Sequence, residues 1–259
     1  MFWLHEEDLP PGVGSAPFSA MHLAWLALFL ALTLYAARLT RRADAARRKR
    51  AGRILGAAVF FFGLCEYGVT ALIGRFGRWT LPLHVCSLMF ALAPLHAWTA
   101  DARPGSFGAR LHRFLGAVIF HPGLPGTLAA LLFPDWLCYP FWNYVSLSSF
   151  LAHGLLLVYG ALILAELAEA PEPRRRFRQD LRASLLFMAV GAAVMFVFDR
   201  VTGTNYWFMA GPSADSPFLS AWVRGGYGGY LLAYALTVAV GTALWYGLRY
   251  FLFVRKKHA

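Results

Sequence analysis

Seven polar side chains lie within or beside strongly apolar segments and have the chemistry to form a site. An ionisable group placed in hydrocarbon costs about 2.5–3.5 kcal/mol on insertion scales, so each one needs a partner or a role. Histidine is a base near neutral pH, a cysteine thiolate is a nucleophile, and amide and phenol groups bind polar ligands. The candidate catalytic residues are His84, Cys86 and His153, and the candidate substrate-binding residues are Glu66, Asn143, Asn205 and Tyr206.

The sequence around His84 predicts how that histidine is placed. Pro82 suits the first position of a helix, with the cap just before it, so His84 falls in the first helical turn. The positive end of the helix dipole favours a neutral imidazole there, which can act as a base or a ligand. His84 and Cys86 are two residues apart and point about 200° apart on a helix, so they cannot form a dyad. A partner has to come from another helix, and His153 is the best placed.

Each candidate also has a purely structural explanation. A histidine between membrane helices often only hydrogen-bonds a neighbouring helix, and a buried cysteine packs as a small apolar group. Glu66 can pair with Arg200 or with a histidine. Asn205 can stabilise a turn of the loop that contains it. The remaining histidines of the apolar region are interpreted as residues of helix ends or of a proline kink, and they are His22, His96, His112 and His121.

The composition shows which elements must position these groups. Hydrophobic residues make up 59% of the 259 residues and charged residues 14%, whereas a soluble domain has about 25% charged residues. Disorder, a coiled coil and an ordinary cytosolic enzyme are excluded on this ground. The three cysteines are odd in number and form no CxxC pair, so neither a disulfide framework nor a zinc site is indicated. Several runs of about 20 residues are almost free of charge and predict membrane-spanning helices.

We predict an all-α membrane protein, a bundle of seven transmembrane helices. Residues 1–18 form an extracytoplasmic segment, residues 19–254 the membrane domain and residues 255–259 a basic cytoplasmic tail. The basic stretch 40–52 could continue a helix, but we interpret it as a cytoplasmic charge cluster that touches anionic lipid. The predicted spans are residues 19–38, 53–73, 81–99, 112–133, 141–165, 181–200 and 230–252.

The distribution of positive charge predicts the orientation. Twenty of the 24 Lys and Arg residues lie in the first, third and fifth connections and at the C-terminal end, and four lie on the other side. Positive loops face the cytoplasm, so the N-terminus is outside and the C-terminus is cytoplasmic. The net charge of +11 therefore meets anionic lipid head groups and indicates no nucleic-acid partner. We expect a multi-pass protein of a bacterial cytoplasmic membrane.

Helix rise gives the depth of the candidate groups below the outer surface. At about 1.5 Å per residue, His84 lies about 5 Å, Glu66 about 10 Å and His153 about 18 Å below the outer end of its helix. A shared wet cavity lowers the cost of burying such groups. We predict that His84 and His153 touch or are bridged by one water, about 3–6 Å apart, although their depths differ by about 13 Å. Asn205 or Tyr206 would roof this cavity, and Glu66 would reach its wall.

Three motifs occur in order along the chain, at residues 81–88 (LPLHVCSL), 152–154 (AHG) and 203–206 (GTNY). Together they resemble the bacterial YwaF-like integral membrane proteins and their animal relatives, the transmembrane protein 164 family. The resemblance covers about the second to the seventh span and implies a seven-helix bundle with a central polar cavity. The animal relatives are considered acyltransferases of ether phospholipids. In their pattern the nucleophilic cysteine directly follows the proline, whereas here Leu83 follows Pro82 and Cys86 lies one turn later on the same face.

The resemblance therefore implies a membrane-embedded enzyme for acyl transfer or acyl-ester hydrolysis on phospholipid-like substrates, with a cavity open to the outer leaflet. His153 would be the general base, Cys86 or a water the nucleophile, and His84 with Asn205 would polarise the carbonyl. The partners would be membrane lipids and an acyl donor, without a cofactor. The alternative is a transporter or ligand-binding protein that uses the buried polar residues. A metal site of Glu66, His84 and His153 has suitable ligand types but no diagnostic spacing, so no metal is assigned.

The orientation is testable by labelling engineered cysteines in intact cells. The charge distribution predicts that thiols near Glu6 and Asp215 react with a membrane-impermeant reagent added outside, and that thiols near Ala45 and Lys257 are protected. Labelling near Ala45 from the outside would reverse the orientation and place the polar groups in the inner leaflet.

Overall fold

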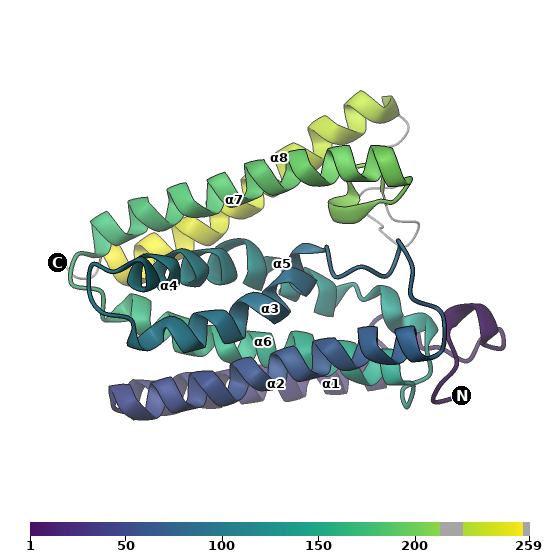
Figure 1. The fold of residues 1–259 in the computed structure, drawn as a ribbon, viewed down its shortest axis with the longest axis horizontal. Coiled ribbons are helices and arrows are strands. Elements are labelled where there is room, and N and C mark those ends of the chain that lie inside the picture. The colour runs from purple at the N-terminus through teal and green to yellow at the C-terminus, as the bar shows by residue number, and fades with distance from the viewer. Residues whose placement is uncertain (213–224, 256–259) are drawn as a thin grey trace.

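The computed structural model describes residues 1–212 and 225–255, and within these ranges the chain is helical without a β-strand (Figure 1). The all-α fold is therefore confirmed. The probe position Asp215, and residues 256–259 of the predicted tail, which include Lys257, lie outside the described residues. The helices are α1 (Ala20–Arg42), α2 (Ala45–Leu72), α3 (Val85–Trp98), α4 (Phe107–Val118), α5 (Leu124–Leu132), α6 (Tyr144–Ala168), α7 (Pro173–Thr202) and α8 (Gly226–Arg249).

Six helical stretches of the described chain are long and apolar enough to cross a membrane. This number confirms a multi-pass protein but not seven helices of spanning length. The third predicted span, residues 81–99, is helical only over the 14 residues of α3, whereas about 20 residues are needed to cross a bilayer core. The six stretches are Ala20–Arg42, Ala45–Leu72, Phe107–Cys138, Tyr144–Ala168, Pro173–Thr202 and Gly226–Leu252.

Helix α3 begins later than the sequence predicted, and His84 is its N-cap residue rather than a member of its first turn. The cause is hydrogen bonding of the preceding backbone. The Leu81 N–H donates to the Tyr206 hydroxyl at 2.8 Å, and the Leu83 carbonyl accepts from the Trp207 indole at 2.7 Å. Because these backbone groups find partners outside the helix, regular helix begins only after His84, whose ψ is 152°.

Helix α2 begins earlier than predicted and takes in most of the basic stretch 40–52. The Asp44 side chain caps it by accepting the Arg47 N–H at 2.8 Å, which satisfies one of the free donors of the first turn. The charge cluster is thus the first turns of a 28-residue helix. Its positive charges lie on a rigid element rather than on a flexible loop.

Helix α6 forms the centre of the bundle, and most of its residues are buried. It packs against α1, α2 and α5, while α4 packs against α7. Figure 1 shows a central layer of α3, α4, α5 and α6, with α1 and α2 on one side of it and α7 and α8 on the other. Large apolar side chains of α7 and α8 are exposed, for example Val197 and Leu244, as expected for helices that face lipid.

The polar connections gather at two opposite ends of the bundle. At one end, Arg48 pairs with Glu169 at 2.5 Å, and Lys49 pairs with Asp101 at 2.6 Å. The hydrogen bond from Lys49 lowers the pKa of Asp101. At the other end, Arg75 pairs with acidic residues 7 and 8 of the N-terminal segment. The loops with many positive charges therefore lie together at one end, as the predicted topology requires.

A π-helical turn, Ile119–Gly123, joins α4 to α5 and contains Pro122. Proline removes a backbone donor, so a carbonyl in the preceding turn needs another partner. The Ser184 hydroxyl on α7 donates to the Ala117 carbonyl, five residues before Pro122, at 3.3 Å. The Trp245 indole on α8 donates to the Phe120 carbonyl, five residues before Pro125, at 3.0 Å. His121 of the same turn lies 2.5 Å from the Arg249 guanidinium, so the irregular turn becomes the docking point of α8.

Small residues on α2 allow close packing of α3. A Cβ atom at Gly56 would lie only 3.0–3.2 Å from backbone atoms of α3, including those of Pro94, whereas a Cβ at Gly68 on the same helix would meet nothing within 4 Å. Close approach through small residues is typical of helix contacts in membranes. The structure therefore predicts strong position dependence for a large side chain on this helix.

We expect Gly56→Leu to lower the thermal stability of the purified protein, because the new side chain collides with the α3 backbone at a cost of about 1–3 kcal/mol. Gly68→Leu is the matched control and should leave the melting temperature in detergent close to that of the unmodified protein. Equal melting temperatures for the two variants would contradict the α2–α3 packing.

Candidate functional site

Ser149 on α6 joins two of the predicted site residues. Its hydroxyl donates to the Glu66 carboxylate on α2 at 2.5 Å. Its main-chain carbonyl accepts a hydrogen bond from His153 Nδ1 at 2.8 Å, one turn further along α6. The structure therefore brings Glu66 and His153 to the same place, through a serine that the sequence analysis did not single out.

The hydrogen bond to Ser149 fixes the tautomer of His153. A carbonyl oxygen only accepts, so the proton lies on Nδ1, and in the neutral ring Nε2 carries a lone pair. Nε2 is buried and has no hydrogen-bond partner in the described part of the chain. Trp136 stacks on the ring at 4.8 Å between centroids, and Phe90 meets it edge-on at 5.1 Å. The ring is held in place with one basic nitrogen unused.

His84 lies at the outer end of α3 beside two aromatic rings. Its ring centroid is 5.0 Å from that of Tyr206 and 5.8 Å from that of Phe208. No hydrogen bond or ring contact joins His84 and His153 among residues 1–212 and 225–255. The predicted direct contact is therefore absent, and a bridge by one water stays a prediction.

The segment that follows α7 is organised by the buried carboxylate of Asp199. Its Oδ1 accepts from the Thr204 hydroxyl and from the Tyr206 N–H, both at 2.8 Å. Gly203, with φ 71°, supplies the left-handed residue that ends α7. Burial raises the pKa of Tyr206, so its phenol stays protonated and donates to the Arg78 carbonyl at 2.8 Å. This segment is thus attached to residues 78–81, which precede α3.

The residues of this site lie in a stretch of the chain that matches a known protein family. A model described as the TMEM164 family matches residues 17–248. The chain belongs to the TMEM164 family. The match contains all seven predicted site residues, so the TMEM164-like resemblance drawn from short motifs is confirmed. No curated protein and no solved structure gives a significant match to the chain.

The side chains of the two asparagines that were predicted to bind substrate form hydrogen bonds to the backbone of this TMEM164 family protein. Asn205 accepts hydrogen bonds from the backbone N–H groups of residues 210–211 and donates to the carbonyl of residue 211. Asn143 caps α6 by accepting the Val145 N–H at 2.8 Å, and it donates to carbonyls of the N-terminal segment. A structural role accounts for the geometry of both, and substrate contact by either stays a prediction.

Cys86 lies in the first turn of α3 as a half-buried free thiol. The neighbouring Ser87 accepts a hydrogen bond from the Tyr67 hydroxyl at 2.9 Å, so polar groups continue along this face. The described residues contain no hydrogen bond between Cys86 and a histidine. A thiol nucleophile would therefore depend on a proton transfer through an intervening group.

Two residues of the site were not found by sequence reasoning. Ser149 precedes His153 by four residues, which places both on one helix face, and this spacing was the available signal. Trp136 comes from the connection between α5 and α6, and the sequence has no feature that predicts its stacking on His153. The site therefore depends on a tertiary contact that only the fold supplies.

Tyr206→Phe tests how His84 is positioned. The change removes the hydrogen bonds to the Leu81 N–H and the Arg78 carbonyl, at a cost of about 1–3 kcal/mol for the pair. We expect faster amide hydrogen exchange across residues 78–84. Tyr227→Phe is the control, because Tyr227 is exposed and its hydroxyl donates to the Met209 carbonyl, outside residues 78–84. Unchanged exchange in Tyr206→Phe would show that the segment is held in another way.

Proposed function

We propose that this TMEM164 family protein acts on acyl esters of phospholipid-like molecules, by hydrolysis or acyl transfer, with His153 as the general base. The observation that carries the proposal is the buried Nε2 atom of His153, which has no partner in the described chain. Leaving a buried polar atom unpaired costs about 1–3 kcal/mol, so a position that keeps one has a use for it. A fixed, unprotonated imidazole nitrogen is what general base catalysis requires.

In the proposed reaction, Nε2 of His153 removes the proton from a water, or through an intervening group from the Cys86 thiol, as that nucleophile attacks the acyl carbonyl. The Nδ1–H bond to Ser149 orients the imidazolium that forms, and a carboxylate at Glu66 stabilises its charge. The ester C–O bond then breaks, and Nε2 returns the proton to the leaving alkoxide. On the thiol route, a water or an acceptor hydroxyl then attacks the acyl-Cys86 thioester, the C–S bond breaks, and the proton of the attacking group passes through Nε2 to the sulfur. His84 would polarise the carbonyl from the outer end of the site.

We further propose that the site lies in the outer half of a bacterial cytoplasmic membrane. The basic connections gather at the end of the bundle opposite the His84 end, and positive loops face the cytoplasm. Helix α3, extended by residues 79–84, would then make a seventh crossing, with the N-terminus outside. A lipid would reach the site from the outer leaflet.

The variant His153→Asn tests the general base. Asparagine keeps a side-chain N–H that can donate to the Ser149 carbonyl but has no basic nitrogen. With the protein in lipid nanodiscs and phospholipids labelled in their acyl chains, we expect the release or transfer of label to fall about 10²–10⁴-fold. Turnover that survives in this variant would contradict the proposal. Lipid binding without turnover by the unmodified protein would instead support the binding or transport alternative.

Cys86→Ser separates the two possible nucleophiles, with Cys65→Ser as the matched control. Both are half-buried free thiols of neighbouring helices. Attack by the thiol predicts that Cys86→Ser abolishes turnover and that a thiol-directed acyl probe labels Cys86 alone. Full turnover in Cys86→Ser would identify water as the nucleophile and would contradict an acyl-cysteine intermediate.

A further inference from the structure

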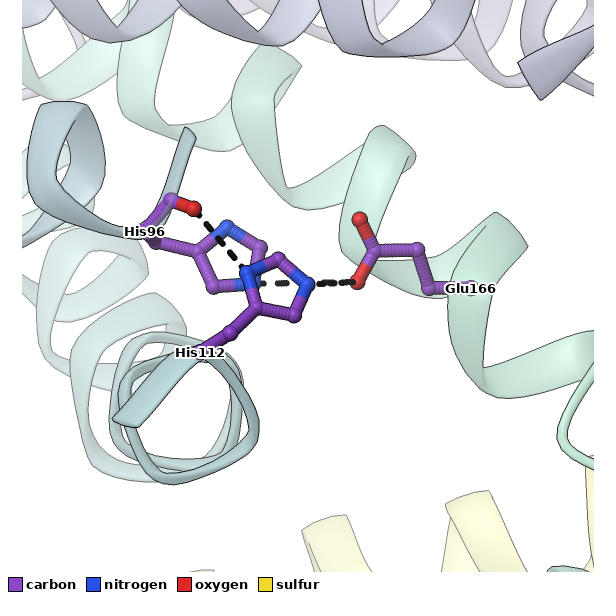
Figure 2. A group of neighbouring side chains, drawn as sticks. All are labelled: His96, His112 and Glu166. Atoms are coloured by element: carbon purple, nitrogen blue, oxygen red, sulfur yellow. Dashed lines mark hydrogen bonds and ion pairs between the residues drawn. The ribbon is translucent and has the colours of Figure 1, made fainter. Parts of the chain in front are cut away.

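A second cluster of polar side chains lies at the other end of the bundle, where α3, α4 and α6 meet. His96 comes from the end of α3, His112 from the first turns of α4 and Glu166 from the end of α6, and Figure 2 shows the three side chains converging. One ligand atom of each lies within 4.8 Å of the others. The Glu166 carboxylate oxygen is 3.5 Å from His112 Nε2 and 3.7 Å from His96 Nε2.

The hydrogen bonds of His112 determine where its proton lies. Its Nδ1 is 3.0 Å from the His96 carbonyl, which only accepts, so Nδ1 carries the proton. The nearby Thr99 hydroxyl donates to carbonyls of the preceding turn and does not supply a competing proton. In the neutral ring, His112 Nε2 therefore presents a lone pair toward the oxygen of Glu166.

His96 lies beside His112, and one of its imidazole nitrogens has no hydrogen-bond partner among the described residues. Its Nδ1 hydrogen-bonds the Tyr159 hydroxyl at 2.7 Å, and its buried Nε2 has no hydrogen-bond partner among the residues that the structure describes. The rings of His96 and His112 are stacked, 4.0 Å between centroids with 15° between their planes. Two imidazole nitrogens and a carboxylate oxygen thus face one another. One proton can satisfy one of the rings, whereas a cation between them satisfies all three groups.

We propose that His96, His112 and Glu166 bind a divalent transition metal ion such as zinc or ferrous iron. Two imidazoles and one carboxylate are the ligand set of open zinc sites and of non-haem iron sites. Ligand atoms about 2.1 Å from a shared tetrahedral ion lie about 3.4 Å apart, which is close to the two separations from Glu166. The Tyr159 hydroxyl and the His96 carbonyl orient the rings from outside, as partners of metal-bound histidines do.

The surroundings of the cluster fit a metal that stays accessible. The Glu166 side chain is 41% exposed, so an ion can enter from that side and keep an open coordination position. The guanidinium of the neighbouring Arg176 is bonded to Asp180 at 2.9 Å, a carboxylate that it shares with Arg249. The metal would join α3, α4 and α6, and it is independent of the proposed acyl chemistry at the opposite end.

The test is metal binding by the purified full-length protein, stripped with chelator and reloaded with zinc or, without oxygen, ferrous iron. We expect about one tightly held ion per chain, and ligand-field bands of a nitrogen- and oxygen-bound site when cobalt replaces it. Calcium and magnesium should not compete, because they prefer oxygen ligands. Absence of a stoichiometric ion in the unmodified protein would overturn the proposal and leave a His112–Glu166 ion pair as the explanation.

Substitutions test whether these three residues bind the ion. His112→Ala and Glu166→Gln should abolish binding or weaken it strongly, and Tyr159→Phe, which removes only an orienting hydroxyl, should weaken it about 10–100-fold. The matched control is Glu169→Gln, since Glu169 follows α6 three residues after Glu166 and pairs with Arg48. Unchanged cobalt affinity and bands in both His112→Ala and Glu166→Gln would contradict the site.

Discussion

Ser149 makes the contact on which the proposed site depends. Through its carbonyl it holds the His153 proton on Nδ1, and through its hydroxyl it holds the Glu66 carboxylate. In hydrocarbon surroundings such bonds are hard to replace, because no bulk water competes for the groups that make them. At this contact, His153 Nε2 is a buried atom without a hydrogen-bond partner among the described residues, and it is the atom to which we assign the proposed base chemistry.

The need to pair polar groups in hydrocarbon surroundings also determines contacts elsewhere in the molecule. Backbone groups that leave regular helix are satisfied by side chains from distant elements, as with Tyr206 and Trp207 at the start of α3 and Trp245 at the π-helical turn. Each of these bonds fixes one helix against another. The two polar clusters, around His153 and around His96, lie at different levels of the bundle and are separated by the apolar core of α3 and α6.

The helices were predictable because hydropathy and charge act along the chain, residue by residue. The shortness of α3 was not, since it results from bonds to Tyr206 and Trp207, more than 120 positions away. The site was predictable in part: Glu66 and His153 are costly to bury and had to find partners, and they share Ser149. The cluster of His96, His112 and Glu166 escaped prediction because its members come from three helices with no recognisable spacing.

The central claim is that His153 keeps a proton on Nδ1 and a free lone pair on Nε2 at neutral pH. The ¹⁵N chemical shifts of the imidazole nitrogens report this state directly in protein labelled with ¹⁵N-histidine and reconstituted in lipid, with the signals assigned by their loss in His153→Asn. We expect a protonated Nδ1 and an unprotonated Nε2. A proton on Nε2, whether in the other neutral tautomer or in an imidazolium, would contradict this claim.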